Sequence, residues 1–143
     1  MPDPNMLSVG DRIPPFSREG TVHHWNRFAA VNYEFAAHHW DDDVARHEGF
    51  PAPFAMAPLL HAYLHAMLRD WAGPTACIAA VGIRLRAPFL KGRTMTAGGK
   101  ITAVREDAGD IHAELELWVD DDTGARLSTG TATVTFPAPA SAG

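Results

Sequence analysis

The strongest structural signal in the sequence is the stretch PLLHAYLHAMLRDW at residues 58–71. Its large apolar side chains recur three and four residues apart, which is the spacing of one face of a helix. Pro58 suits the first turn of such a helix, where a missing N–H removes no hydrogen bond. Gly73 and Pro74 follow and are typical helix terminators. The stretch therefore predicts one long helix with a broad buried face.

The sequence after this helix changes to the period of two that is typical of strands. Four strands are expected, over residues 77–86, 93–105, 110–119 and 126–136. Acidic residues and glycine at 106–109 and 121–124 are typical of tight hairpin turns. One long helix followed by an antiparallel meander predicts an α+β domain in which the sheet wraps around the helix.

Shorter elements are expected before the long helix. Residues 9–15 are predicted to lie at a sheet edge, because two adjacent prolines exclude a central strand. Thr21 can cap a helix over residues 22–32, and Asp41 can cap a short helix over residues 42–48.

Length and composition narrow the class of protein. The 143 residues suit a single domain over 1–143, with residues 1–8 and 137–143 expected to be flexible. A net charge of −5 without a basic cluster argues against nucleic-acid binding. No apolar run reaches the roughly 18 residues of a membrane span. Cys77, the one cysteine, is expected to be a small buried residue.

The location follows from the same features. The first four residues lack the basic start and apolar core of a signal peptide. A single cysteine cannot form an internal disulfide, so the expected location is the reducing cytoplasm.

The candidate catalytic residues lie in the stretch YEFAAHHWD at residues 33–41, before the long helix. Glu34 stands five residues before His39. Imidazole titrates near neutral pH and suits proton transfer, and a carboxylate beside it can share a water or orient the ring. The spacing predicts an acid/base pair; the alternative is a structural histidine beside a solvated glutamate.

Residues 33–60 resemble the hydratase motif of MaoC-like dehydratases, which have the hot-dog fold. That motif is a carboxylate or amide, four residues, His-x-Asp, a short helix and Gly-Phe/Tyr-Pro. Here Glu34, His39 and Asp41 match its first part, and Gly-Phe-Pro at 49–51 matches its second. The family motif has aspartate at the position of Glu34 and continues with His-Gly, where this chain has Met-Ala.

The resemblance covers about residues 9–136, including the run GIRLRAPF at 82–89. A closer likeness, through residues 70–74 and 81–85, is to the small MaoC-like subunits of actinobacterial hydratases of cholesterol side-chain breakdown. Those enzymes pair the small subunit with a second MaoC-like chain. The resemblance therefore implies a homodimer or a heteromer with a second MaoC-like chain.

The implied activity is (R)-type hydration of an α,β-unsaturated acyl-CoA with a steroid side chain or another bulky acyl group. His39 and Glu34 would activate water, and the backbone amide of Ala57 would stabilise the enolate. No cofactor and no metal are implied, since the substrate is carried as a coenzyme A thioester. The alternatives are a non-catalytic or half-catalytic subunit, a hot-dog thioesterase and a ligand-binding domain.

Five further residues are expected to bind substrate. Met56 and Tyr63 are either core residues or walls of an acyl tunnel. Arg84, Arg86 and Lys91 gather near a turn, where they could meet coenzyme A phosphates or form an ordinary exposed surface.

Other histidines have weaker cases. His38 adjoins His39 but is expected on the other side of an extended segment. His61 and His65 share a helix face without the glutamate of a zinc-protease motif, so they are expected to pack or to line a cavity.

Overall fold

The computed structural model describes residues 1–138. The predicted flexible tail over 137–143 falls largely outside these residues. The helices are α1 (Val22–Asn32), α2 (Asp42–His47) and α3 (Ala57–Ala72), with 3-10 turns η1 (Pro4–Met6) and η2 (Ala37–His39). The strands are β1 (Arg12–Glu19), β2 (Cys77–Leu85), β3 (Thr94–Asp107), β4 (Asp110–Asp121) and β5 (Arg126–Phe136).

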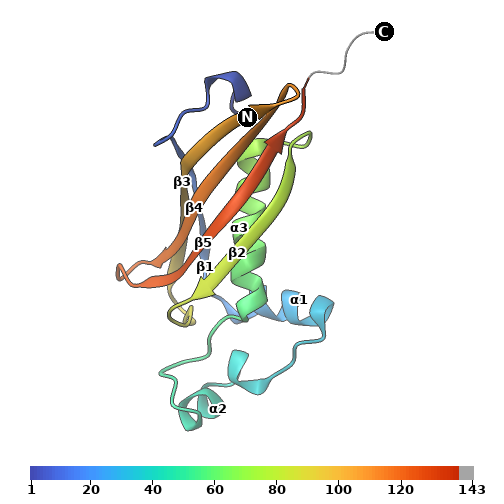
Figure 1. The fold of residues 1–143 in the computed structure, drawn as a ribbon. Coiled ribbons are helices and arrows are strands. Elements are labelled where there is room, and N and C mark those ends of the chain that lie inside the picture. Colours follow the sequence, from blue (N-terminus) through green and yellow to red (C-terminus); the bar gives the residue numbers. More distant parts are fainter. Residues whose placement is uncertain (139–143) are drawn as a thin grey trace.

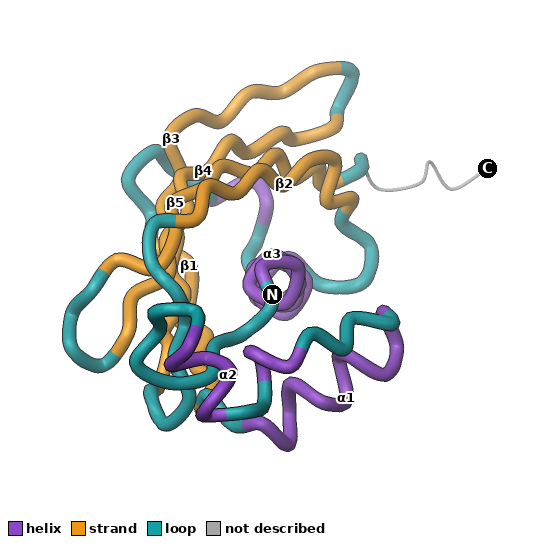
Figure 2. Tube along the Cα trace, turned by 90° about the horizontal axis from the view of Figure 1, so that it is seen from below, coloured by secondary structure: helices purple, strands orange, loops and turns teal. Residues whose placement is uncertain are grey.

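The five strands form one antiparallel sheet in the order β1-β3-β4-β5-β2. Helix α3 runs along the inner face of the curved sheet, while α1 and α2 lie beyond one end (Figures 1 and 2). The predicted α+β domain, with a sheet wrapped around a long helix, is confirmed. No helix within residues 1–138 is long and apolar enough to cross a membrane.

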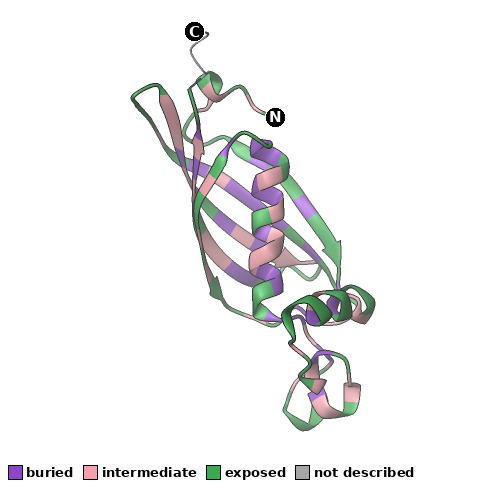
Figure 3. Ribbon diagram, turned by 90° about the vertical axis from the view of Figure 1, so that its right-hand side faces the viewer, coloured by how far each residue is buried: buried purple, intermediate pink, exposed green. Residues whose placement is uncertain are grey.

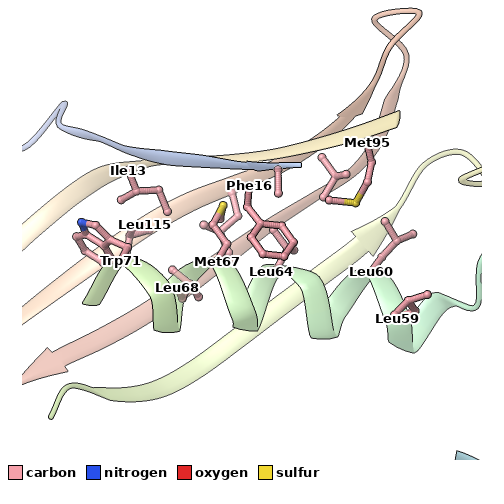
Figure 4. Packing of buried hydrophobic residues seen from close by; sticks show 14 of the residues in the cluster. Ile13, Phe16, Leu59, Leu60, Leu64, Met67, Leu68, Trp71, Met95 and Leu115 are labelled. Atoms are coloured by element: carbon pink, nitrogen blue, oxygen red, sulfur yellow. The ribbon is translucent and has the colours of Figure 1, made fainter. Parts of the chain in front are cut away.

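The core lies between α3 and the sheet. Leu60, Leu64, Met67 and Leu68 are at most 2% exposed, and they point from α3 toward the strands (Figure 4). Alternate residues of β4, including Leu115, complete this layer, and the buried bands of Figure 3 follow the same alternation. Burial of each large side chain contributes roughly 2 kcal/mol, so this layer holds α3 against the sheet.

The segment that carries the predicted motif is shaped by its caps. Thr21 accepts a hydrogen bond from the His24 amide and starts α1, as predicted. Tyr33 ends α1 in the left-handed region with a φ of 54°. Asp41 accepts hydrogen bonds from two amides and starts α2, and Gly49, with a φ of 92°, allows the turn after it.

Two details differ from the expectations. The first strand, β1, extends to Glu19, although its prolines still confine it to an edge of the sheet. Cys77 is exposed, not buried, because it begins β2, which pairs only with β5. The apolar sequence around Cys77 lies on an open sheet edge within the described residues.

Candidate active site

His39 and Glu34 lie together at the end of the molecule where α3 begins. His39 is 5% exposed, and its Nδ1 lies 2.7 Å from the backbone oxygen of Phe54. A carbonyl oxygen only accepts, so Nδ1 carries the proton. The other ring nitrogen, Nε2, then has a free lone pair in the neutral ring, and it lies 3.8 Å from Oε1 of Glu34. The predicted pair is therefore together in space, with the ring oriented as a base.

The turn after α1 places Glu34. The left-handed conformation of Tyr33 ends the helix, and the amide of Glu34 donates a hydrogen bond to the carbonyl of Ala29 at 3.2 Å. The Glu34 side chain is about one-third exposed. A separation of 3.8 Å from Nε2 is too long for a direct hydrogen bond, but both atoms can contact the same small molecule.

An aromatic cluster that includes His38 and Phe54 packs against His39. The rings of Phe50 and Phe54 lie 4.2 Å apart, and His38 stacks on Phe54 with an interplanar angle of 11°. His38 also pairs with Glu48 at 2.8 Å. His38 was expected on the other side of an extended segment, but it lies in the turn η2 with its ring against that of His39. Phe54 and Glu48 were not predicted. The contact through Phe54 is made by a backbone oxygen, which no side-chain motif encodes.

A largely apolar groove of about 290 Å³ opens beside the start of α3. It is lined by Phe50, Phe54, Ala55, Ala57, Leu60, Leu85, Arg86, Ala87, Pro88 and Phe89. Ala57 is exposed as the first residue of α3, and no acceptor for its N–H occurs among residues 1–138. Because a helix N-terminus carries partial positive charge, this amide suits a developing negative charge.

The three predicted basic residues do not form one cluster. Arg86 lines the groove beside Ala57, while Arg84 and Arg86 together line a neighbouring groove of about 350 Å³. Lys91 instead bonds to Asp42. The hydrogen bond from Lys91 holds the pKa of Asp42 below its usual value.

Met56 and Tyr63 do not line the groove. Met56 is 1% exposed and belongs to the core. Tyr63 is half-buried with its ring 6.0 Å from that of Phe16, and burial raises the pKa of its phenol. Both positions agree with the core alternative. Within residues 1–138, no three His, Cys, Asp or Glu side chains gather as a metal site.

Several solved structures share this architecture. The ChsH1–ChsH2 complex from Mycobacterium tuberculosis matches with a TM-score of 0.82 and 26% identity, over 92% of this chain and 100% of that chain. The (R)-hydratase of A. caviae matches with a TM-score of 0.84 and 26% identity, over 92% and 98%. A MaoC-like dehydratase from Rhodospirillum rubrum, at 19% identity and a TM-score of 0.80 over 94% and 97%, shares the fold.

A sequence relative decides the family. No family model matches the chain. The chain is 30% identical over 101 residues to the 3-oxo-4,17-pregnadiene-20-carboxyl-CoA hydratase beta subunit of Mycobacterium tuberculosis, covering 71% of this chain and 78% of the relative. The chain belongs to the MaoC-like hydratase family. The resemblance and the hot-dog fold inferred from residues 33–60 are thus confirmed, as is an enzyme of the hydratase class.

Proposed function

We propose that this MaoC-like chain is an (R)-specific enoyl-CoA hydratase for acyl groups with a steroid side chain or of similar bulk. The observation that carries the proposal is the buried His39, whose Nε2 is left free by the bond from Nδ1 to a carbonyl and lies 3.8 Å from Glu34. The names of the two hydratase relatives support the stereochemistry and the acyl class.

In the proposed reaction, a water contacts both Nε2 of His39 and the carboxylate of Glu34. His39 takes one proton as the water oxygen attacks Cβ of the enoyl thioester, and Glu34 accepts a hydrogen bond from the remaining O–H. Electrons move to the thioester oxygen and form an enolate, which the Ala57 amide stabilises. The proton then passes from His39 to Cα, so that one water has been added across the double bond.

The groove at the start of α3 and the neighbouring groove on β2 and β5 suit the rest of the substrate. Apolar side chains such as Phe50 and Leu85 would contact the acyl part next to the Ala57 amide. Arg86 lies where the two grooves meet, and Arg84 lies further along, where both could bind coenzyme A phosphates. No cofactor takes part in this scheme.

The open edge of β2 supports the proposal that this chain binds a partner chain. Its nine residues pair only with β5, and the sequence CIAAVGIRL offers neither proline nor charge before Arg84. Such an edge is prone to pair with another strand. We propose that a second MaoC-like chain, identical or different, covers it, because the ChsH1–ChsH2 complex and the hydratase beta subunit are relatives named as parts of assemblies. The exposed single Cys77 fits the reducing cytoplasm.

The test is product analysis in isotope-labelled water. The assembly that the chain forms is incubated with enoyl-CoA esters of short, long and steroid acyl groups, and products are identified by mass and chirality. We expect labelled (R)-3-hydroxyacyl-CoA from the wild type and almost none from His39→Ala. Release of free coenzyme A would favour a thioesterase, and no product from any ester would overturn the proposal.

The half-catalytic alternative is tested in the same assay. Hydration by the chain purified alone, as a homodimer, would contradict it. Activity that appears only when a second MaoC-like chain is added would support it.

A further inference from the structure

The rings of His38 and His39 lie against each other and against one phenylalanine. His38 stacks on Phe54 with ring centres 5.0 Å apart, and it meets the His39 ring edge-on at 4.3 Å. The His39 ring packs edge-on against Phe54 at 5.2 Å. His38 and Phe54 thus bound the His39 ring on two sides and restrict its rotation.

Glu48 holds His38 in this place. Its Oε2 lies 2.8 Å from Nδ1 of His38, and the two side chains are 43% and 26% exposed. Because a carboxylate only accepts, Nδ1 of His38 carries a proton. Glu48 stands at the end of α2 and His38 in η2, so the pair joins two elements that surround the site.

A separate contact fixes the direction of the backbone carbonyl of Phe54. An antiparallel bridge joins Phe54 to Leu90, and hydrogen bonds on either side of Phe54 close that bridge. In such a pair the carbonyl of the central residue points away from the partner strand. The oxygen of Phe54 is therefore fixed in position and accepts from Nδ1 of His39.

We propose that His38 is a positioning residue for the hydration reaction, a proposal that rests on the role of His39 as the base. His38 keeps the His39 ring turned so that Nδ1 donates to the fixed Phe54 carbonyl. The proton then stays on Nδ1, and Nε2 remains able to take a proton from water. Without His38 the ring turns, and the tautomer with its proton on Nε2, which cannot act as the base, gains population.

Ring-nitrogen NMR of the isotope-labelled histidines tests this without any substrate. In the wild type and in the control His23→Ala, an exposed histidine of α1, His39 carries its proton on Nδ1. In His38→Ala the Nε2-protonated form becomes visible, whereas His38→Phe, which keeps the stack but loses the contact with Glu48, shows a smaller rise. An unchanged tautomer in His38→Ala overturns the proposal.

Kinetics give the second readout. We expect kcat of His38→Ala to fall about tenfold while KM changes less than about twofold, because a positioning residue acts on the chemical step. Equal loss in the His23→Ala control would contradict this. If the wild type proves to be no hydratase, the NMR result still decides the positioning role, so the two failures are distinguishable.

A second variant distinguishes loss of positioning from a folding defect in His38→Ala. Glu48→Ala removes the partner of His38 on the surface and leaves both rings in the chain. A smaller rise of the Nε2-protonated form in that variant supports the proposal, and no rise overturns it.

Discussion

Glu34 is the side chain whose length matters most in this account. With the backbone fixed by the turn at Tyr33, the shorter Glu34→Asp variant moves the carboxylate away from Nε2 of His39, now 3.8 Å distant. A misplacement of about 1 Å can cost up to a hundredfold, so we expect kcat to fall between about tenfold and a hundredfold. Steady-state hydration kinetics measure this, and Glu106→Asp, at the opposite end of the sheet, serves as the control.

Asp42 gives the chain a pH-dependent contribution to stability. Its pKa is lowered in the folded state by the hydrogen bond from Lys91, so its contribution is complete above the unfolded pKa of about 3.9 and is lost as pH falls through the lower folded pKa. We expect Asp42→Asn to lower Tm at pH about 7 and to match the wild type under strongly acidic conditions. A Tm difference that is the same at both pH values would contradict this, and Asp43→Asn, in the same helical turn, is the matched control.

The sequence allowed the proposed acid/base pair to be predicted but not what orients it. Glu34 and His39 stand at a recognisable spacing, and the structure brings them together. Phe54 acts through a backbone oxygen whose direction depends on a bridge to Leu90, far along the chain. Lys91 was expected at the substrate, yet it binds Asp42. This pair was not predicted, because an ion pair between distant segments leaves no local pattern in the sequence.

In the proposed reaction, helix α3 contributes its first amide as well as its buried face. Ala57→Pro removes that N–H, while proline remains favourable at a first helical position and Met56 before it is already extended. Loss of one oxyanion donor costs about a hundredfold or more in kcat, so we expect that loss with little change in Tm. Ala57→Ser, which keeps the N–H, is the control; equal rates in the two variants would remove the amide from the mechanism.

The elements themselves were largely predictable. Strong periodicity placed the long helix and four strands to within one or two residues, since each has one face toward the core. Cys77 was misjudged because an apolar sequence looks the same in a buried strand and on an open edge. Which strand lies at the edge depends on the order β1-β3-β4-β5-β2, and no local signal states that order.

At the scale of the molecule, the open edge of β2 predicts that the chain assembles with at least one partner chain. Light scattering should give a mass of at least two chains for the purified wild type. Lysine on an edge strand discourages pairing, so Ala80→Lys, at an exposed position of β2, should raise the dissociation constant about tenfold or more, equivalent to about 1.4 kcal/mol. Thr96→Lys, at an exposed position of β3 that pairs with both β1 and β4, should not. A wild type that stays monomeric both alone and in the presence of a second MaoC-like chain would contradict the proposed pairing.

The proposed role of His39 as the base of an enoyl-CoA hydratase is tested by kcat/KM for hydration by wild type and His39→Ala. Both are purified in the assembly that the chain forms, with folding checked by circular dichroism. General-base catalysis is worth about a hundredfold to ten-thousandfold, and we predict a loss of that size. Hydration by His39→Ala at the wild-type rate would contradict the account.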